Sequence, residues 1–289
     1  LLGIGLDEGT ALVVQGDRGE IIGRGKAFVH NGRDGNDPGF PYRVLLPGDR
    51  YDLATRSMTA RGIDGGPLGE EFVDSLFADF NTPATPGAAV LVAMDGRILL
   101  SKGYGLADLE ARSPVTPHTN FRLASVTKQF TAMAAMLLVQ DKKLRLDETL
   151  TDVFPDFPAY GRRITVRHLL THTSGLQDYE NFVPDSQATQ VLDADVLRRM
   201  ALLDSTYFTP GAKFRYSNSG FAVLAMIVEK RSGTRFADFL KARIFDRVGM
   251  PWTLAREDGR AAVQRRAFGH TRRKGAWART DQSSASAVL

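Results

Sequence analysis

The first 62 residues alternate between short apolar runs and turn residues. Apolar and β-branched side chains dominate residues 10–14, 20–22 and 26–30. Short runs of this kind, bounded by glycine and aspartate, are typical of β-strands. Residues 31–41 are rich in Gly, Asn, Asp and Pro, and we expect a loop there. The pattern predicts a β-rich segment over 1–62, which is small for an independent domain.

A helical pattern replaces the strand pattern further along the chain. Residues 63–86 combine a glycine-rich hinge with apolar side chains at helical spacing. Residues 87–94 and 97–104 read as two strands around Asp95-Gly96, a typical hairpin turn. Further helical segments are expected at 125–140, 166–171, 193–203, 219–231 and 235–248. A hairpin followed by helices predicts an α+β fold around an antiparallel sheet.

Composition excludes several kinds of site. The 289 residues include 37 Lys and Arg, 33 Asp and Glu, and no cysteine. The absence of cysteine excludes a disulfide framework, a cysteine nucleophile, thiolate zinc sites and iron–sulfur clusters. The longest apolar runs, 132–139 and 221–228, are far shorter than the roughly 20 residues that span a bilayer. We therefore expect no transmembrane segment.

Positive charge is concentrated near the end of the chain. Residues 260–280 contain seven basic side chains and no acidic one. Such a stretch can bind nucleic acid or an anionic surface. However, charge runs are usually solvated, and no zinc-finger, RNP or basic-zipper motif accompanies this one. We expect an exposed basic loop and no nucleic-acid partner.

The segment Ser125-Val126-Thr127-Lys128 places a hydroxyl and an amine one helical turn apart. Residues i and i+3 share a helix face. A serine hydroxyl becomes a good nucleophile when a nearby base takes its proton. A lysine can be that base if burial lowers its pKa, or it can relay the proton. The alternative for this motif alone is a helix cap by Ser125 beside an exposed Lys128.

A second short motif, Tyr216-Ser217-Asn218, comes just before an apolar helical stretch. A tyrosine held near a lysine can ionise and act as a general base. An asparagine there can hydrogen-bond a substrate amide. The alternative is a helix cap by Ser217 or Asn218 beside a core Tyr216.

Two histidines, His168 and His172, are spaced i, i+4, which is also a metal-ligand spacing. The residues between them lack the Glu of a zinc-protease helix, and no third ligand is evident. A structural histidine pair is therefore favoured over a metal site. Gly175 follows where a helix C-cap is expected.

The order of these motifs resembles one family. Ser-x-x-Lys, His-Thr-Ser-Gly and Tyr-Ser-Asn follow one another as in serine β-lactamases and penicillin-binding-protein-like proteins, specifically the class C β-lactamase, D,D-peptidase and esterase branch. Three further segments resemble this family: Phe121-Arg122-Leu123-Ala124, Pro210-Gly211-Ala212-Lys213-Phe214 and Ile244-Phe245-Asp246-Arg247-Val248-Gly249-Met250. The resemblance begins near residue 68. It implies a β-lactamase/transpeptidase-like fold, with an antiparallel sheet and a helical subdomain.

The resemblance also implies roles. Ser125 would attack an amide, β-lactam or ester carbonyl and form an acyl-enzyme. Lys128 and Tyr216 would share the general base and acid work, and Asn218 would orient the substrate. The Ser125 backbone N–H would supply half of an oxyanion hole.

The partner that the resemblance implies is a small-molecule or peptide substrate, with no metal or organic cofactor. The choice among the three carbonyl classes and the oligomeric state stay open. Family members are often exported, so a periplasmic or secreted location is the expectation. The order of residues typical of a secretory signal does not occur at the start of this sequence.

We find no good match for the third motif of the family. That motif consists of Lys or His, then a small residue, then Gly. Gly269-His270-Thr271-Arg272 carries Arg where Gly is needed and follows Tyr216 too closely. We therefore expect the chain to lack the C-terminal strands of the fold. The alternative to an active hydrolase is a truncated module that is inert or only binds peptides.

A separate resemblance covers about residues 1–55. The sequence of residues 5–29 resembles the C-terminal end of cyanophycinase-like serine peptidases. The segment that carries the nucleophile in that family is not part of this resemblance. No catalytic residue is therefore carried over. The expected organisation is a β-rich segment at 1–62, a hinge and first helix at 63–86, and an incomplete β-lactamase-like domain at 87–289.

Overall fold

The computed structural model describes residues 3–6, 10–23, 27–30, 43–45, 48–59, 70–94, 97–184, 191–256 and 262–279. The chain divides into two compact units. One comprises Leu1–Asn81 and Ala89–Lys102, and the other comprises Thr82–Ala88 and Gly103–Leu289. Within the ranges described, no helix combines the length and the apolar character needed to cross a bilayer.

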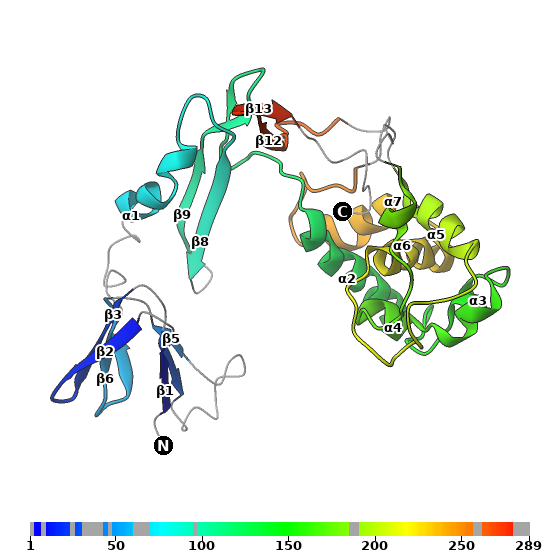
Figure 1. Ribbon diagram of the computed structural model, residues 1–289, viewed down its shortest axis with the longest axis horizontal. Helices are drawn as coiled ribbons and strands as arrows, with labels where there is room; N and C mark the ends of the chain where they lie inside the picture. Colours follow the sequence, from blue (N-terminus) through cyan, green and yellow to red (C-terminus); the bar gives the residue numbers. More distant parts are fainter. Residues whose placement is uncertain are drawn as a thin grey trace. The chain divides into compact units, whose positions relative to one another are not determined.

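Two small antiparallel sheets occupy the N-terminal part of the first unit (Figure 1). One sheet has the order β1-β4-β5, and the other has the order β2-β3-β6-β7. Their strands are β1 (Gly3–Leu6), β2 (Thr10–Gln15), β3 (Arg18–Gly23), β4 (Ala27–His30), β5 (Arg43–Leu45), β6 (Arg50–Asp52) and β7 (Ser57–Thr59). The β-rich character expected for this segment is confirmed, while the loop expected at 31–41 lies outside the described residues.

The small core of these sheets consists of Ile21, Ala27, Val29, Leu45 and Tyr51. Alternate residues of a strand face the same side, so the apolar positions of β3 and β4 meet there. Gly16 has a φ of 58° in the two-residue turn between β2 and β3. Glycine reaches this left-handed region without a steric penalty, which suits a tight hairpin.

A helix and most of a hairpin follow in the same unit. Helix α1 (Glu70–Leu76) and the 3-10 turn η1 (Ala78–Phe80) precede β8 (Ala88–Met94) and β9 (Arg97–Tyr104), which pair with each other. The ammonium of Lys102 on β9 lies 2.8 Å from the carboxylate of Asp74 on α1. The predicted hairpin strands are confirmed. The Asp95-Gly96 turn and residues 63–69 of the expected hinge lie outside the described residues.

Helices dominate the second unit. The α-helices are α2 (Lys128–Gln140), α3 (Leu150–Val153), α4 (Val166–Leu170), α5 (Asp193–Ala201), α6 (Asn218–Ser232) and α7 (Phe236–Leu240). Shorter turns are η2 (Ala124–Thr127), η3 (Ala159–Arg163), η4 (Tyr179–Phe182) and the π-helical turn η5 (Lys241–Phe245). The helix expected at 235–248 is therefore two pieces, α7 and η5.

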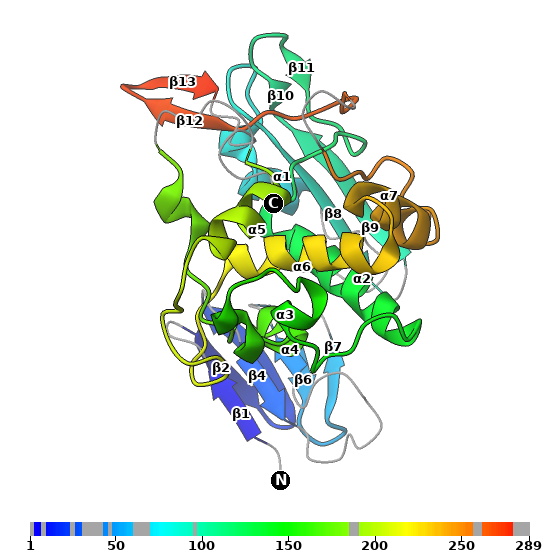
Figure 2. The same ribbon diagram turned by 90° about the vertical axis from the view of Figure 1, so that its right-hand side faces the viewer.

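Helix α6 is the centre of this unit (Figure 2), where α2, α4, α5 and α7 contact it. Most of its residues from Ser219 to Val228 are buried. A helix that is apolar on all sides is stable only when neighbours cover every face. The apolar run that the sequence shows at 221–228 thus becomes the core helix around which the others pack.

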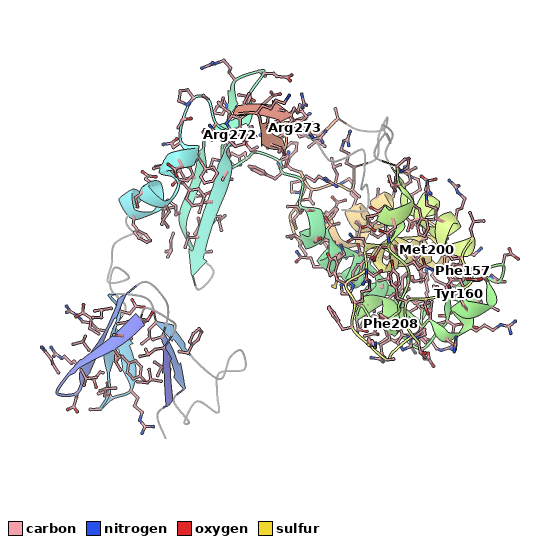
Figure 3. All side chains as sticks on the ribbon, in the orientation of Figure 1. Phe157, Tyr160, Met200, Phe208, Arg272 and Arg273 are labelled. Atoms are coloured by element: carbon pink, nitrogen blue, oxygen red, sulfur yellow. The ribbon has the colours of Figure 1, made fainter. Side chains whose placement is uncertain are left out.

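The aromatic pair Phe157 and Tyr160 fills one end of this core (Figure 3), where Met200 of α5 lies beside it. The two ring centroids are 5.2 Å apart. The Tyr160 hydroxyl donates to the Met200 carbonyl over 2.6 Å, which satisfies a buried polar group. Burial raises the pKa of this phenol, so Tyr160 is neutral at physiological pH.

Four short strands complete the second unit: β10 (Leu106–Asp108) pairs with β11 (Ser113–Pro114), and β12 (His270–Arg273) pairs with β13 (Ala276–Arg279). The prediction of a basic loop at 260–280 is wrong for the second half of that range, because the β12–β13 hairpin lies there. The Arg272 guanidinium lies 5.9 Å from the Trp277 ring centroid, and that of Arg279 lies 3.3 Å from the Phe268 centroid. These two contacts place basic side chains of the hairpin over aromatic rings.

Gly175 does not cap a helix, contrary to expectation. Helix α4 ends at Leu170, and His172 rather than Gly175 is the first left-handed residue after it, with a φ of 56°. Gly175 has a φ of 69°, and a Cβ there would lie 2.6 Å from the Phe208 carbonyl oxygen. A long-range backbone approach therefore requires this glycine, and no local pattern reveals such an approach.

Candidate active site

Ser125 lies in the 3-10 turn η2, immediately before α2. Ala124, the residue before it, has a φ of 46°. A non-glycine residue in this region costs about 1 kcal/mol or more, and it persists only where the surrounding structure enforces it. The N-cap residue of α2 is Thr127, with no side-chain cap bond, so the alternative in which Ser125 caps the helix is wrong. The turn instead leaves Ser125 exposed to solvent.

Lys128, the first residue of α2, is only 7% exposed. Its Nζ donates to Asn218 Oδ1 over 2.7 Å and to Ser125 Oγ over 3.4 Å. The same ammonium lies 4.8 Å from the Tyr216 ring centroid and 5.6 Å from that of Phe221. The alternative of an exposed lysine is therefore wrong. A buried amine faces the serine hydroxyl.

Tyr216 brings its phenol to the same hydroxyl. Its OH donates to Ser125 Oγ over 2.7 Å, and the residue is 45% exposed, so the alternative of a core tyrosine is wrong. Partial burial opposes ionisation, but hydrogen bonds with Lys128 and Ser125 and the charge of Lys128 outweigh it, and the pKa of Tyr216 lies below its ordinary value. The lowered pKa makes the phenolate more accessible, and a phenolate at this position is suited to taking a proton from Ser125.

Asn218 links the lysine to an acidic side chain. Its Oδ1 accepts from Lys128, and its Nδ2 donates to Glu180 Oε1 over 2.6 Å. These two partners determine which way the amide points. Ser217 caps α6, because its hydroxyl accepts the Gly220 N–H over 3.0 Å, so that part of the capping alternative is confirmed.

Sequence reasoning missed Glu180. It lies on η4, outside every motif singled out in the sequence, and 38 residues before Asn218. A lone glutamate in a short polar turn carries no pattern that would distinguish it. Only the packing of η4 near the start of α6 brings it to the site.

The two histidines each accept a backbone hydrogen bond. His168 Nδ1 accepts the Thr165 N–H over 3.3 Å in the first turn of α4, and His172 Nδ1 accepts the Ser217 N–H over 3.1 Å. The His172 ring also stacks on Tyr216, with centroids 4.6 Å apart and planes at 28°. Burial and, secondarily, the charge of Lys128 lower the pKa of His172, which favours the neutral ring.

The described residues contain no group of three or more His, Asp or Glu side chains that could hold a metal ion. What they do bring together is a hydroxyl, an ammonium, a phenol and an amide, supplied by η2, α2 and residues 216–218. Such a set has the groups needed to take a proton from a serine and return it to a leaving group.

Comparison with known proteins agrees with this geometry. The Beta-lactamase family model matches residues 73–288. A penicillin-binding protein of Bacillus subtilis (strain 168) is 36% identical over 183 residues, which cover 62% of this chain and 40% of that protein. A D-aminopeptidase of Gluconobacter oxydans (strain 621H) is 34% identical over 189 residues, covering 61% of this chain and 34% of that protein. The chain thus spans well under half the length of these two relatives.

A solved structure is also similar. The D-amino acid amidase from Ochrobactrum anthropi SV3 matches with a TM-score of 0.63 and 28% identity, over 76% of this chain and 64% of that one. The chain belongs to the β-lactamase family, with the β-lactamase/transpeptidase-like fold.

Proposed function

We propose that this chain carries the nucleophilic half of a serine hydrolase active site, which acts on amides and related carbonyls through an acyl-enzyme on Ser125. The observation that carries the proposal is the pair of bonds to one hydroxyl. Ser125 Oγ lies 2.7 Å from the Tyr216 phenol and 3.4 Å from the Lys128 ammonium. The phenol is within the usual distance for direct proton transfer, and the ammonium lies slightly beyond it.

In the proposed reaction, ionised Tyr216 takes the proton of Ser125 as Oγ bonds to the carbonyl carbon. The carbonyl π electrons move to oxygen, and the tetrahedral intermediate then expels the leaving amine, which receives that proton. Lys128 stabilises the phenolate by its charge and its hydrogen bond, which the lowered pKa of Tyr216 supports. Water, deprotonated by the same groups, attacks the ester, and Ser125 recovers its proton when the acid leaves.

Asn218 is proposed to have two tasks. Its Oδ1 holds the Lys128 ammonium, and an amide keeps one further donor hydrogen and one further lone pair for a substrate. Its bond to Glu180 limits rotation of the amide, so any substrate contact is made in one orientation.

Among carbonyl classes we favour amides of amino acids and peptides over β-lactams and esters. The support is that the proteins similar to this chain include a D-aminopeptidase and a D-amino acid amidase. A panel of a D-amino acid amide, a chromogenic cephalosporin and a p-nitrophenyl ester separates the three classes. We expect the release of ammonia from the D-amino acid amide to be the fastest of the three reactions. Faster cleavage of the cephalosporin or of the ester would contradict the preference for amides.

The test of the site itself is covalent labelling. The purified chain is incubated with a fluorophosphonate probe and its intact mass is measured. One adduct is expected, absent from Ser125→Ala and retained in Ser101→Ala, which changes an exposed serine on β9. If wild type gains no adduct, the alternative of an inert or peptide-binding module is favoured.

The assignment of residues 1–62 to a cyanophycinase-like end stays a prediction, as do the boundaries at 62 and 86.

A further inference from the structure

His172 contacts the proposed general base in several ways. Its ring stacks on Tyr216, and its Nδ1 accepts the N–H of Ser217, the next residue along the chain. Its backbone carbonyl accepts the N–H of Arg215 over 2.9 Å. Hydrogen bonds to one histidine therefore bracket Tyr216 on both sides, and the imidazole covers the phenol ring between them.

The imidazole is itself held by its neighbours. The Phe221 ring of α6 lies 5.0 Å from it, and the Phe214 ring meets it edge-on at 5.9 Å. The backbone of His172 is in the left-handed region, with a φ of 56°, so the surrounding structure determines its conformation. A ring fixed in this way can serve as a rigid support for Tyr216.

We propose that neutral His172 is a positioning residue, which holds the Tyr216 hydroxyl against Ser125 and Lys128. The inference rests on the proposed function and adds a residue to it. Tyr216 is nearly half exposed, so its phenol could turn towards solvent if nothing covered the ring. The ring must be neutral because a protonated imidazole has donors at both nitrogens and could not accept the Ser217 N–H.

Two variants separate the stacking from the hydrogen bond. His172→Asn removes the ring, keeps an oxygen that can accept the Ser217 N–H and tolerates left-handed backbone. His172→Phe keeps a stacking ring and removes the acceptor. His168→Asn is the matched control, because its imidazole accepts a backbone N–H within α4 instead.

Two measurements are made on the full chain. The first is the rate at which a fluorophosphonate labels Ser125. The second is the titration of Tyr216, followed by NMR of protein carrying 13C at the tyrosine ring, with Tyr216→Phe to assign the signal. In His172→Asn we expect labelling to be about tenfold slower. This is the change in rate that corresponds to losing the stabilisation of one aromatic pair. The pKa of Tyr216 should rise towards its ordinary value, because the phenol leaves Lys128.

His172→Phe should label within about threefold of wild type, since the stacked ring remains. His168→Asn should change neither measurement. A wild-type rate and titration in His172→Asn would overturn the inference. An equal loss in both His172 variants would support it and show that the Ser217 hydrogen bond contributes as much as the stacked ring. If Ser125 of wild type takes no label, the proposed function fails, whereas the Tyr216 titration still tests the role of His172.

Discussion

The ammonium of Lys128 donates to the side-chain oxygen of Asn218 across 2.7 Å, although 90 residues separate the two in sequence. This bond joins the Ser-x-x-Lys and Tyr-Ser-Asn motifs into one site. It also provides a partner for a charge that is almost entirely removed from water. A buried ammonium without such a partner would be strongly unfavourable.

Replacing Lys128 by Met should separate activity from stability. Labelling of Ser125 should fall at least about 100-fold, the usual range for losing a general acid–base group. The melting temperature should stay equal or rise, because a buried charge is replaced by an apolar side chain of similar length. Lys143→Met, at an exposed lysine, should behave as wild type in both assays. A large drop in melting temperature together with lost labelling would assign Lys128 a structural role instead.

The pH dependence of labelling should report the ionisation of Tyr216. In the proposed reaction the Tyr216 phenolate is the base, so the rate should rise with pH through the pKa of Tyr216. Because Lys128 and Ser125 lower that pKa, the midpoint should lie below the ordinary value of about 10. In Lys128→Met the residual rate should rise at higher pH than in wild type. A profile of Tyr216→Phe that keeps the wild-type midpoint would show that another group titrates.

Glu180 should act through Asn218. Glu180→Gln removes the negative charge from a hydrogen bond at an exposed position, so labelling should slow only about threefold. In an Asn218→Ala background the same change should have almost no effect, because there is no amide left to orient. A double-mutant cycle measures this coupling. Asp147→Asn, at an exposed carboxylate, is the control, and additive effects of the two changes would contradict the prediction.

The ion pair of Glu148 and Arg231 should stabilise the helical unit. Glu148 is mostly buried, and its second carboxylate oxygen accepts the Arg145 N–H. Glu148→Ala leaves the Arg231 guanidinium without this partner and should lower the free energy of unfolding by about 3 kcal/mol. This value is at the lower end of the range for a buried pair, because Arg231 reaches solvent.

The exposed pair Arg235 and Asp238 provides the comparison. Asp238→Ala should cost about 0–1 kcal/mol, as is usual for surface pairs. Both variants are measured by chemical denaturation with the same probe of helix content. An equal cost for the two would show that burial of Glu148 contributes nothing.

Local patterns predicted most of the elements and the four side chains that the structure brings together. The strands of the β2–β3 hairpin, the helices at 125–140 and 219–231, and the four residues Ser125, Lys128, Tyr216 and Asn218 all follow from spacing and motif order. These features depend on neighbours within a few residues or on motif order, and both are visible in one dimension.

The same patterns failed where distant packing decided the outcome. Gly175 is needed for the Phe208 carbonyl rather than for a helix end, and Arg279 of β13 stacks on Phe268, outside its own hairpin, instead of lying in an open loop. In each case the deciding contact is with a residue that local periodicity does not relate to it.

The sequence by itself determined which chemical groups this protein offers: a serine, a lysine, a tyrosine and an asparagine in motifs of one family. Only the tertiary structure decided their states. Burial of Lys128, the lowered pKa of Tyr216, the stacking of His172 on Tyr216 and the hydrogen bond of Glu180 arise when α2, the segment after α4, η4 and α6 pack together. Exclusion of water and the distances between charges determine these properties, and both are fixed by packing rather than by residue order.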